Sequence, residues 1–504
     1  MEDFRCIIRE TRSLDGSFFP QKVELKDGLY YVLSAWVQAS EGSDNIITAA
    51  FRYSSGAATQ AGTVIAKQGC WSLLKGGIVS NVTAPAHIIF KAKNSSAQIW
   101  VDNVSVQPFT EEQWRSHQDQ RISMVRKRTI RLNISDANDN GKTLGGAKVI
   151  INLVKQHFPF GCSMSKNIVN NQAYQSWFSS RFRVTTFQNE LKWYDNEPTQ
   201  GKENYANSDY MINFAHSHGI SVRGHNVFWD NFNFQPYWVK GLSPDQLRAA
   251  ADKRINSVVS RYRGGVISWD VVNENLHFRF FEDKLGNDFS KSAYWKAHQL
   301  DKGATLFMNE YNTVEDGRDP ASLPQNYVKK LWEIQGSVGG APIGIGLQSH
   351  FSQFQPNIVY MRSALDTMGA TKMPVWLTEV DVKPNPNQVK YLEQILREGF
   401  AHPAVQGIVL WSGPAVDSGY FMTLADNKFS NTPGGDLVDR LLKEWRSEDA
   451  EFTTDDNGLL EVSLFHGEYQ VTVVHPTTNS STMLSVDIND KLPAKESFHI
   501  HIHV

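Results

Sequence analysis

The stretch Trp269-Asp-Val-Val-Asn-Glu-Asn-Leu-His277 changes from apolar to polar within a few residues. Its first half has the apolar, β-branched composition of a buried strand. Its second half is a polar cluster of Asn273, Glu274, Asn275 and His277. In a parallel α/β barrel the strand bodies fill the core and the strand C-termini open onto the substrate. The stretch therefore predicts a barrel strand that ends at a catalytic mouth.

A second stretch, Val375-Trp-Leu-Thr-Glu-Val-Asp-Val382, has the same form and carries Glu379 where the first carries Glu274. Two carboxyl groups at one barrel mouth suit glycoside hydrolysis, which needs a nucleophile and an acid. The chain has 53 acidic residues, so many pairs of acids would occur by chance. This pair is significant because its two glutamates lie at the ends of the fourth and seventh strands of the predicted barrel. The alternative is that both glutamates form salt bridges at the barrel rim.

The segment 157–446 alternates strand-like and helix-like patterns. The predicted strands end near Ser163, Lys192, Trp229, Glu274, Asn312, His350, Asp381 and Trp411. Helices are predicted over 246–263, 388–400 and 437–445, the last capped by Asp436. This alternation predicts a (β/α)8 TIM barrel. A doubly wound sheet would also alternate, but no Gly-rich phosphate loop follows a strand.

The flanking segments predict further β structure. Residues 1–108 contain short strands such as 30–39 and 98–106, which are typical of a β-sandwich. A connecting segment, 109–156, should hold a helix over 110–128 and a β pair at 129–135 and 147–154. Residues 447–504 should form a small C-terminal β domain. Its last stretch places His499, His501 and His503 on one strand face, and we expect a half-buried edge strand there rather than a metal site.

Composition excludes several classes of partner. At 504 residues, two or three domains are expected. The net charge of −3 is too small to predict binding to nucleic acid or to a membrane surface. The apolar runs are too short to cross a bilayer, and the charged N-terminus predicts no secretory signal in the chain as given. The three cysteines have no metal-ligand spacing, so we expect no metal site built on them.

Other predicted strand ends are polar too. Asn189 and Lys192 close the second strand, and His225 precedes Trp229 on the third. The sixth ends in Gln348-Ser-His350, and the fifth in Asn309-Glu-Tyr-Asn312, which offers Glu310 as a third carboxylate. We expect Glu310 to have a supporting or purely structural role, because no acid on a neighbouring strand repeats the pattern of the other two.

Together these motifs resemble glycoside hydrolase family 10, the retaining endo-β-1,4-xylanases, and in particular its plant branch. WDVVNEN looks like the acid/base motif of that family, and WLTEVDV looks like its nucleophile motif. The resemblance implies that Glu274 is the acid/base and Asn273 a sugar contact. It implies that Glu379 is the nucleophile, oriented by His350 and Asp381, and that no cofactor takes part.

The resemblance also implies a set of residues that line the sugar sites on the glycone side. They are Gln188, Asn189, Lys192, His225, Trp229, Gln348 and Trp411. The family pattern has glutamate in place of Gln188, and plant members have tryptophan in place of Pro414. Because a carboxylate would accept stronger hydrogen bonds and pair with Lys192, we predict from the sequence that Gln188→Glu strengthens binding of xylo-oligomers.

Residues 1–108 resemble a family 22 carbohydrate-binding module that is short at its N-terminus. The resemblance extends through 109–128 and to 465–469. It implies an enzyme that acts outside the cell on xylan, or on another β-1,4-linked polysaccharide of the cell wall. We expect the chain to act as a monomer and to bind neither nucleic acid nor membrane.

Three alternatives stay open from the sequence. A catalytically weak xylan-binding protein is favoured by Gln188, Pro414 and the short module, and is opposed by the intact carboxylate pair. A transglycosylase, or a β-glucanase or mannanase on the same barrel, would share both carboxylates. If the chain is the retaining hydrolase, the charge of Glu379 is expected to raise the pKa of Glu274 until the covalent ester forms.

Overall fold

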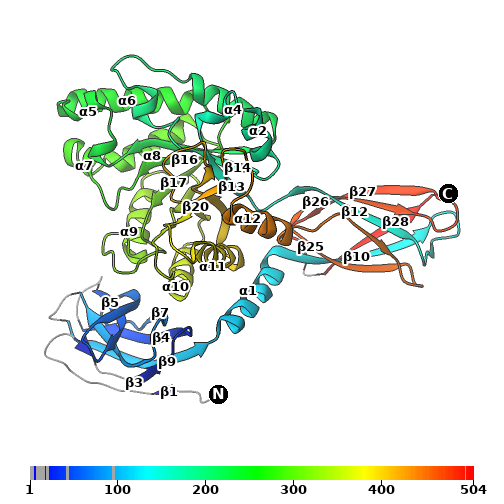
Figure 1. Ribbon diagram of the computed structural model, residues 1–504, viewed down its shortest axis with the longest axis horizontal. Coiled ribbons are helices and arrows are strands. Elements are labelled where there is room, and N and C mark those ends of the chain that lie inside the picture. Colours follow the sequence, from blue (N-terminus) through cyan, green and yellow to red (C-terminus); the bar gives the residue numbers. More distant parts are fainter. Residues whose placement is uncertain are drawn as a thin grey trace. The chain divides into compact units, whose positions relative to one another are not determined.

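The computed structural model (Figure 1) describes residues 5–6, 17–18, 22–40, 45–93, 97–493 and 495–503. The chain divides into two compact units. One comprises residues 1–115, 160–399 and 404–432, and the other comprises 116–159, 400–403 and 433–504. No helix among the described residues combines the length and the apolar character needed to cross a membrane.

The first unit contains a closed parallel barrel. Its strands are β13 (Phe160–Met164), β14 (Val184–Phe187), β15 (Ser221–Trp229), β16 (Ser268–Asn273), β17 (Thr305–Glu310), β18 (Ile343–Leu347), β20 (Val375–Val382) and β21 (Val405–Leu410). Each pairs in parallel with the next in this order, and β21 pairs with β13, which closes the ring. The short β19 (His350–Phe351) continues beside β20. The predicted (β/α)8 barrel is confirmed.

Helices lie outside these strands, as Figure 1 shows. They are η1 (Lys166–Ile168), α2 (Gln172–Ser179), α3 (Trp193–Asn196), α4 (Ala206–Ser217), η2 (Phe232–Phe234), α5 (Tyr237–Lys240), α6 (Pro244–Arg261), α7 (Phe280–Leu285), α8 (Phe289–Leu300), α9 (Pro324–Gln335), α10 (Ile358–Gly369) and α11 (Gln388–Ala401). The helices predicted over 246–263 and 388–400 are confirmed as α6 and α11. Most barrel-strand residues are buried on both faces, which accounts for their nearly continuous apolar sequence.

Two local predictions need correction. The second strand does not reach Lys192, because β14 ends at Phe187 and Lys192 N–H donates to the Asn189 carbonyl in a turn before α3. Asp436 does not cap the last helix. This helix, α12 (Pro433–Glu444), begins at Pro433, because proline is tolerated in the first turn of a helix.

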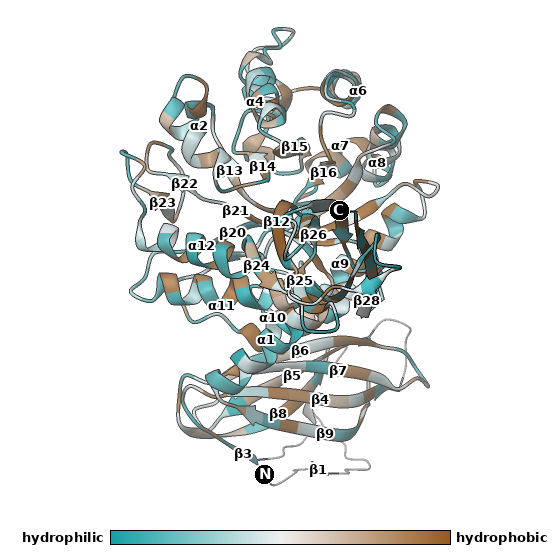
Figure 2. Ribbon diagram, turned by 90° about the vertical axis from the view of Figure 1, so that its right-hand side faces the viewer, coloured by the Kyte–Doolittle hydropathy of each residue, from teal (hydrophilic) through white to brown (hydrophobic). Residues whose placement is uncertain are grey.

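A two-layer β-sandwich precedes the barrel in the first unit. One sheet has the order β1 (Arg5–Cys6), β9 (Ile99–Phe109), β4 (Tyr30–Ala39), β7 (Ser72–Val79). The other has the order β2 (Ser17–Phe18), β8 (Ala84–Ala92), β5 (Asn45–Tyr53), β6 (Ala58–Ala66), with β3 (Lys22–Leu25) also on β8. Inward residues such as Leu33 and Phe51 are fully buried between the sheets. The hydropathy colours alternate along these strands (Figure 2), and the predicted sandwich is confirmed.

The second unit is another sandwich, and its pairing corrects the sequence analysis. Its strands are β10 (Lys127–Asp136), β11 (Lys142–Thr143), β12 (Lys148–Gln156), β24 (Ala450–Thr453), β25 (Leu459–Phe465), β26 (Gly467–Val474), β27 (Ser481–Ile488) and β28 (Lys495–Ile502). The strands predicted at 129–135 and 147–154 exist as β10 and β12, but they do not pair with each other. β10 pairs with β25 and β28, whereas β12 pairs with β24 and β26.

This pairing means that the strands within 127–156 and 450–502 share one hydrophobic core, with Leu132 and Val471 fully buried in it. Local sequence patterns show that a segment is a strand but not which distant strand it meets. The predicted helix over 110–128 is α1 (Glu111–Arg126). The predicted terminal strand is β28, in which His501 Nδ1 lies 2.6 Å from Ser135 Oγ. Two short strands after the barrel, β22 (Gly413–Pro414) and β23 (Thr423–Ala425), pair with each other.

Candidate active site

Both glutamates singled out by the sequence lie at the C-terminal mouth of the barrel. Glu379 belongs to β20, and Glu274 follows the last residue of β16. The backbone of Glu274 is left-handed, with a φ of 61°. Such a conformation is unfavourable for a residue other than glycine and is held only by surrounding structure. Here the Glu274 N–H donates to the carbonyl of Asn309 on the neighbouring strand at 3.0 Å.

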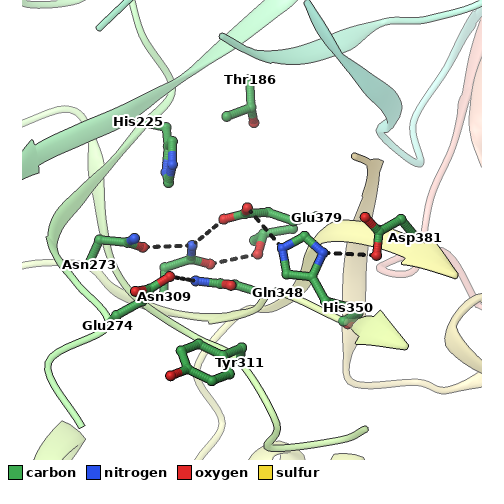
Figure 3. A network of polar contacts seen from close by, with 12 residues as sticks. Thr186, His225, Asn273, Glu274, Asn309, Tyr311, Gln348, His350, Glu379 and Asp381 are labelled. Atoms are coloured by element: carbon green, nitrogen blue, oxygen red, sulfur yellow. Dashed lines mark hydrogen bonds and ion pairs between the residues drawn. The ribbon is translucent and has the colours of Figure 1, made fainter. Parts of the chain in front are cut away.

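Glu379 is held by an amide and an imidazole (Figure 3). Asn309 Nδ2 donates to Glu379 Oε1 at 2.7 Å and to Asn273 Oδ1 at 3.0 Å. His350 Nε2 lies 3.4 Å from Glu379 Oε2, while its Nδ1 lies 2.9 Å from Asp381 Oδ1. The imidazole is therefore fixed between two carboxylates.

The charges around Glu379 keep it anionic. Burial alone would raise the pKa of Glu379, but His225, His350 and Lys192 more than offset burial and lower it to about 2. The opposing shift on His350 is consistent, because Asp381 and Glu379 raise the pKa of its imidazole well above the ordinary value despite burial. An ionised carboxylate with fixed hydrogen bonds is what a nucleophile requires.

Glu274 has the opposite electrostatic environment. Its side chain is buried, and it accepts hydrogen bonds from Trp229 Nε1 at 2.6 Å and from Gln348 Nε2 at 3.1 Å. Burial raises the pKa of Glu274 to about 7, the charge of Glu310 is the next largest cause, and the charge of Glu379 raises it less than that of Glu310 does. The charge of Glu379 does raise the pKa of Glu274, as expected from the sequence, but it is not the main cause of the shift. Desolvation and the acid on the adjacent strand matter more.

Glu310 occupies the end of β17 and is fully buried. It accepts from His277 Nδ1 at 2.6 Å and from the N–H groups of Leu276 and Tyr311 at 2.9 and 3.1 Å. The His277 ring stacks on Tyr311 with centroids 3.8 Å apart and also bonds Asp319 at 2.9 Å. Glu310 thus holds the segment that follows Glu274 through hydrogen bonds and places a negative charge near the Glu274 carboxyl group.

The aromatic and basic residues of the predicted sugar set meet on one side of this pair. Lys192 Nζ lies 4.7 Å from the centre of the Trp229 ring and 5.4 Å from that of Trp411. Burial lowers the pKa of Lys192, against the attraction of Glu379 and Glu274. The His225 ring lies against Trp411 with centroids 5.8 Å apart. These contacts form a wall with flat ring faces and one buried ammonium.

Two further members of the set have their own anchors. Gln188 Nε2 donates to the backbone carbonyl of Ser418 at 2.6 Å, and Asn189 Oδ1 accepts from Tyr194 Oη at 2.7 Å. No hydrogen bond joins Gln188 to Lys192 among the described residues. The Gln188 NH2 group instead donates to the Ser418 carbonyl, a bond that an ionised carboxylate at this position could not make.

The structure brings the predicted catalytic, supporting and sugar-binding residues to one mouth, and it adds Asn309, to which the sequence analysis gave no role. Asn309 ends a strand in the same apolar-to-polar manner as Asn273, so its position was visible. Its bond to Glu379 was not visible. Phe234 was also missed, and it stacks on Trp229 with ring centroids 3.9 Å apart.

Comparisons with known proteins agree with this geometry. The profile of glycosyl hydrolase family 10 matches residues 150–418. Endo-1,4-beta-xylanase 5-like of Arabidopsis thaliana is 42% identical over 98% of this chain and 88% of its own length. Endo-1,4-beta-xylanase 4 of the same plant is 43% identical over 95% and 86%. Xylanase 10B from Thermotoga petrophila, solved with xylobiose, shares the fold with a TM-score of 0.50, at 23% identity over 57% of this chain and 94% of that one.

Proposed function

The chain belongs to glycosyl hydrolase family 10, and we propose that it is an endo-1,4-β-xylanase that cleaves xylan with retention of configuration. The observation that carries the mechanism is the opposite pKa shift of two carboxyl groups at one mouth, about 7 for Glu274 and about 2 for Glu379. One group is thus protonated for part of its time near neutral pH and the other is ionised, as an acid and a nucleophile must be. The names of the Arabidopsis relatives support xylan as substrate.

In the first step, Glu379 attacks the anomeric carbon and forms an ester with the glycone sugar. Glu274 gives its proton to the departing oxygen, and the bond to the leaving chain breaks. Trp229 and Gln348 hold the acid by donating to its two oxygens. Asn309 holds one oxygen of the nucleophile, and His350 lies beside the other.

In the second step, Glu274 takes a proton from water, and the resulting hydroxide displaces Glu379 from the sugar. Esterification removes the charge of Glu379, so the pKa of Glu274 falls and the group is free to act as a base. Burial and Glu310 remain, however, and they are the larger causes of the elevation. We therefore infer that the fall is only partial, and that Glu274 stays a moderately strong base during deglycosylation.

The wall formed by Lys192, Trp229 and Trp411 is assigned to the glycone sugars. Ring faces offer apolar contact to the flat faces of pyranose rings, and the buried ammonium donates to hydroxyl groups. Gln188, Asn189 and His225 extend this wall. Because xylan is a wall polysaccharide, we place the enzyme outside the cell. Because one chain supplies the whole mouth, we expect it to act as a monomer.

The test is release of reducing ends from arabinoxylan, cellulose and mannan, with Glu379→Ala as the inactive control. Release from arabinoxylan alone supports the proposal. Preferential release from cellulose or mannan would identify another β-1,4-glycanase on the same barrel. Binding of arabinoxylan without release from any substrate would identify a binding protein instead.

A further inference from the structure

We propose that the N-terminal β-sandwich forms one wall of the substrate cleft on the leaving-group side, with Thr59 and Gln60 contacting the sugars there. The inference rests on the proposed endo-xylanase function. It gives the sandwich a part in the cleft where the bond is cleaved.

Residues of the sandwich and of the barrel together line an open cavity of about 240 Å³ that includes His350. The start of β6 contributes Thr59 and Gln60, and the barrel contributes Asn312 and His350 among others. His350 is the residue whose Nε2 lies 3.4 Å from Glu379. His350 thus belongs both to the lining of the cavity and to the surroundings of Glu379, so the two sites adjoin. Its volume is below the roughly 300–1,000 Å³ of pockets that enclose whole drug-sized ligands, which suits a short part of a passing chain.

The position of the carboxylates around the ring decides which side of the cleft this is. Glu274 and Glu379 stand at β16 and β20, with β17 and β18 between them on one side. The wall of Lys192, Trp229 and Trp411 comes from the other side, at β14, β15 and β21. The barrel residues of the cavity follow β17 and β18. A linear polysaccharide cut between the carboxylates runs from one side to the other, so the cavity receives the leaving part.

Buried and partly buried hydrogen bonds hold the sandwich in place against the barrel. Thr63 Oγ1 donates to Gln325 Oε1, and Gln325 Nε2 donates back to the Thr63 carbonyl, both at 2.6 Å. Asn357 Nδ2 donates to the Gly77 carbonyl at 3.0 Å. Gly77 is required there, because an added Cβ would lie 2.4 Å from the Val359 side chain. These contacts fix β6 at the cavity, so a sugar bound there would not have to order it.

The lining has the chemistry that sugars require. Phe354 offers an aromatic ring that is 69% exposed, and Asn312 and Glu315 offer an amide and a carboxylate. From the sandwich, Thr59 offers a hydroxyl and Gln60 an amide. Within the described part of the chain the Gln60 amide has no hydrogen-bond partner. Its donors and acceptor are thus free to bind sugar hydroxyls.

The experiment compares Gln60→Ala in the full chain with Gln107→Ala, the same change at an exposed position of β9 in the same sandwich. Two substrates distinguish binding on the glycone side of the cleft from binding on the leaving-group side. An aryl β-xylobioside places no sugar beyond the cleaved bond, whereas xylohexaose does. We expect Gln60→Ala to lower kcat/KM on xylohexaose about three- to tenfold, the value of one lost hydrogen bond. Neither variant should change turnover of the aryl substrate, and Gln107→Ala should leave both rates unchanged.

A second measurement determines which bond of reducing-end-labelled xylohexaose is cleaved. Loss of a contact on the leaving side should shift cleavage toward bonds that leave fewer sugars there, and general damage to the barrel would not cause that shift. Equal rates for the two variants and wild type, or an equal fall on both substrates, would overturn the inference while the wild-type activity stands. A wild-type chain inactive on every substrate would instead overturn the proposed function, and this inference with it.

Discussion

At the scale of single residues, the elevated pKa of Glu274 has two main causes, burial and the neighbouring charge of Glu310. Burial is a property of the whole mouth, but the charge of Glu310 can be removed by one substitution of similar shape. Glu310 therefore offers a direct test of the electrostatics. The acid is active while protonated, so kcat/KM should fall as pH rises through the pKa of Glu274.

Glu310→Gln should move this alkaline limb to lower pH, because removal of a negative charge makes ionisation of Glu274 easier. The pH profile of kcat/KM on xylohexaose measures the shift. Asp319→Asn is the matched control, since it also removes a partner of His277 but is not among the causes of the Glu274 shift. A limb that stays in place, or moves to higher pH, would contradict this account.

Glu274→Gln should nearly abolish turnover of xylan, because a poor leaving group needs the proton. General acid assistance is typically worth about 10²–10⁴-fold. Aryl xylobiosides with activated leaving groups should still form the covalent intermediate, since they leave without protonation. Burst kinetics with such a substrate would reveal the intermediate. Equal loss of the first step on activated and natural substrates would show that Glu274 is not the acid.

Gln188→Glu should weaken binding of xylo-oligomers, which reverses the expectation from sequence. The amide donates to the Ser418 carbonyl, whereas an ionised carboxylate has no donor and would oppose that oxygen. Loss of such a bond with an unsatisfied partner costs about 1–3 kcal/mol in local stability. Because this loss displaces a side chain of the sugar wall, kcat/KM on xylotriose should fall about several-fold. Turnover of a simple aryl xyloside should change little. A gain on xylotriose would restore the sequence-based expectation.

At the scale of elements, the pairing of β10 with the C-terminal strands offers a stability test. Leu132 is fully buried in β10, and its neighbours include β25 and β28. Leu132→Ala should cost about 2–5 kcal/mol in the unfolding free energy of this sandwich. Amide hydrogen exchange should then accelerate in 459–465 and 495–502.

Arg131→Ala is the control, because its ion pair with Glu461 at 3.0 Å joins two half-exposed side chains and such pairs are worth roughly 0–1 kcal/mol. Faster exchange confined to 127–136 in Leu132→Ala, with the C-terminal strands unaffected, would argue against the shared core.

At the scale of the whole molecule, the proposed role of the sandwich predicts that its contact with the barrel affects both stability and activity on long substrates. Gln325→Ala removes both hydrogen bonds with Thr63 and leaves buried polar groups unpaired, at a cost of about 1–3 kcal/mol. We expect a lower melting temperature by calorimetry and a selective loss on xylohexaose like that of Gln60→Ala. Glu333→Ala, an exposed change on the same helix α9, should do neither. Normal activity on long substrates despite a lower melting temperature would separate the two roles.

The sequence by itself was enough to predict the barrel and the two carboxylates at its mouth. An apolar run that ends in polar residues is a local pattern. Burial of a parallel strand on both faces requires the apolar run, and the opening of the strand end onto the barrel mouth allows the polar residues. Alternation along 30–39 and 98–106 likewise predicted strands of the sandwich. Asn309 showed the same local pattern as Asn273, but nothing in its neighbourhood along the chain pointed to Glu379.

Only the tertiary structure decided how distant parts act on one another. It showed that β10 and β12 pair with C-terminal strands and that the Gln188 amide donates to Ser418. It also showed that burial and the charge of Glu310 are the main causes of the pKa shift of Glu274. The physical reason is the same in each case. Periodicity along a chain records which face of a segment is buried, whereas charges, hydrogen bonds and strand partners act through space between residues that the sequence keeps far apart.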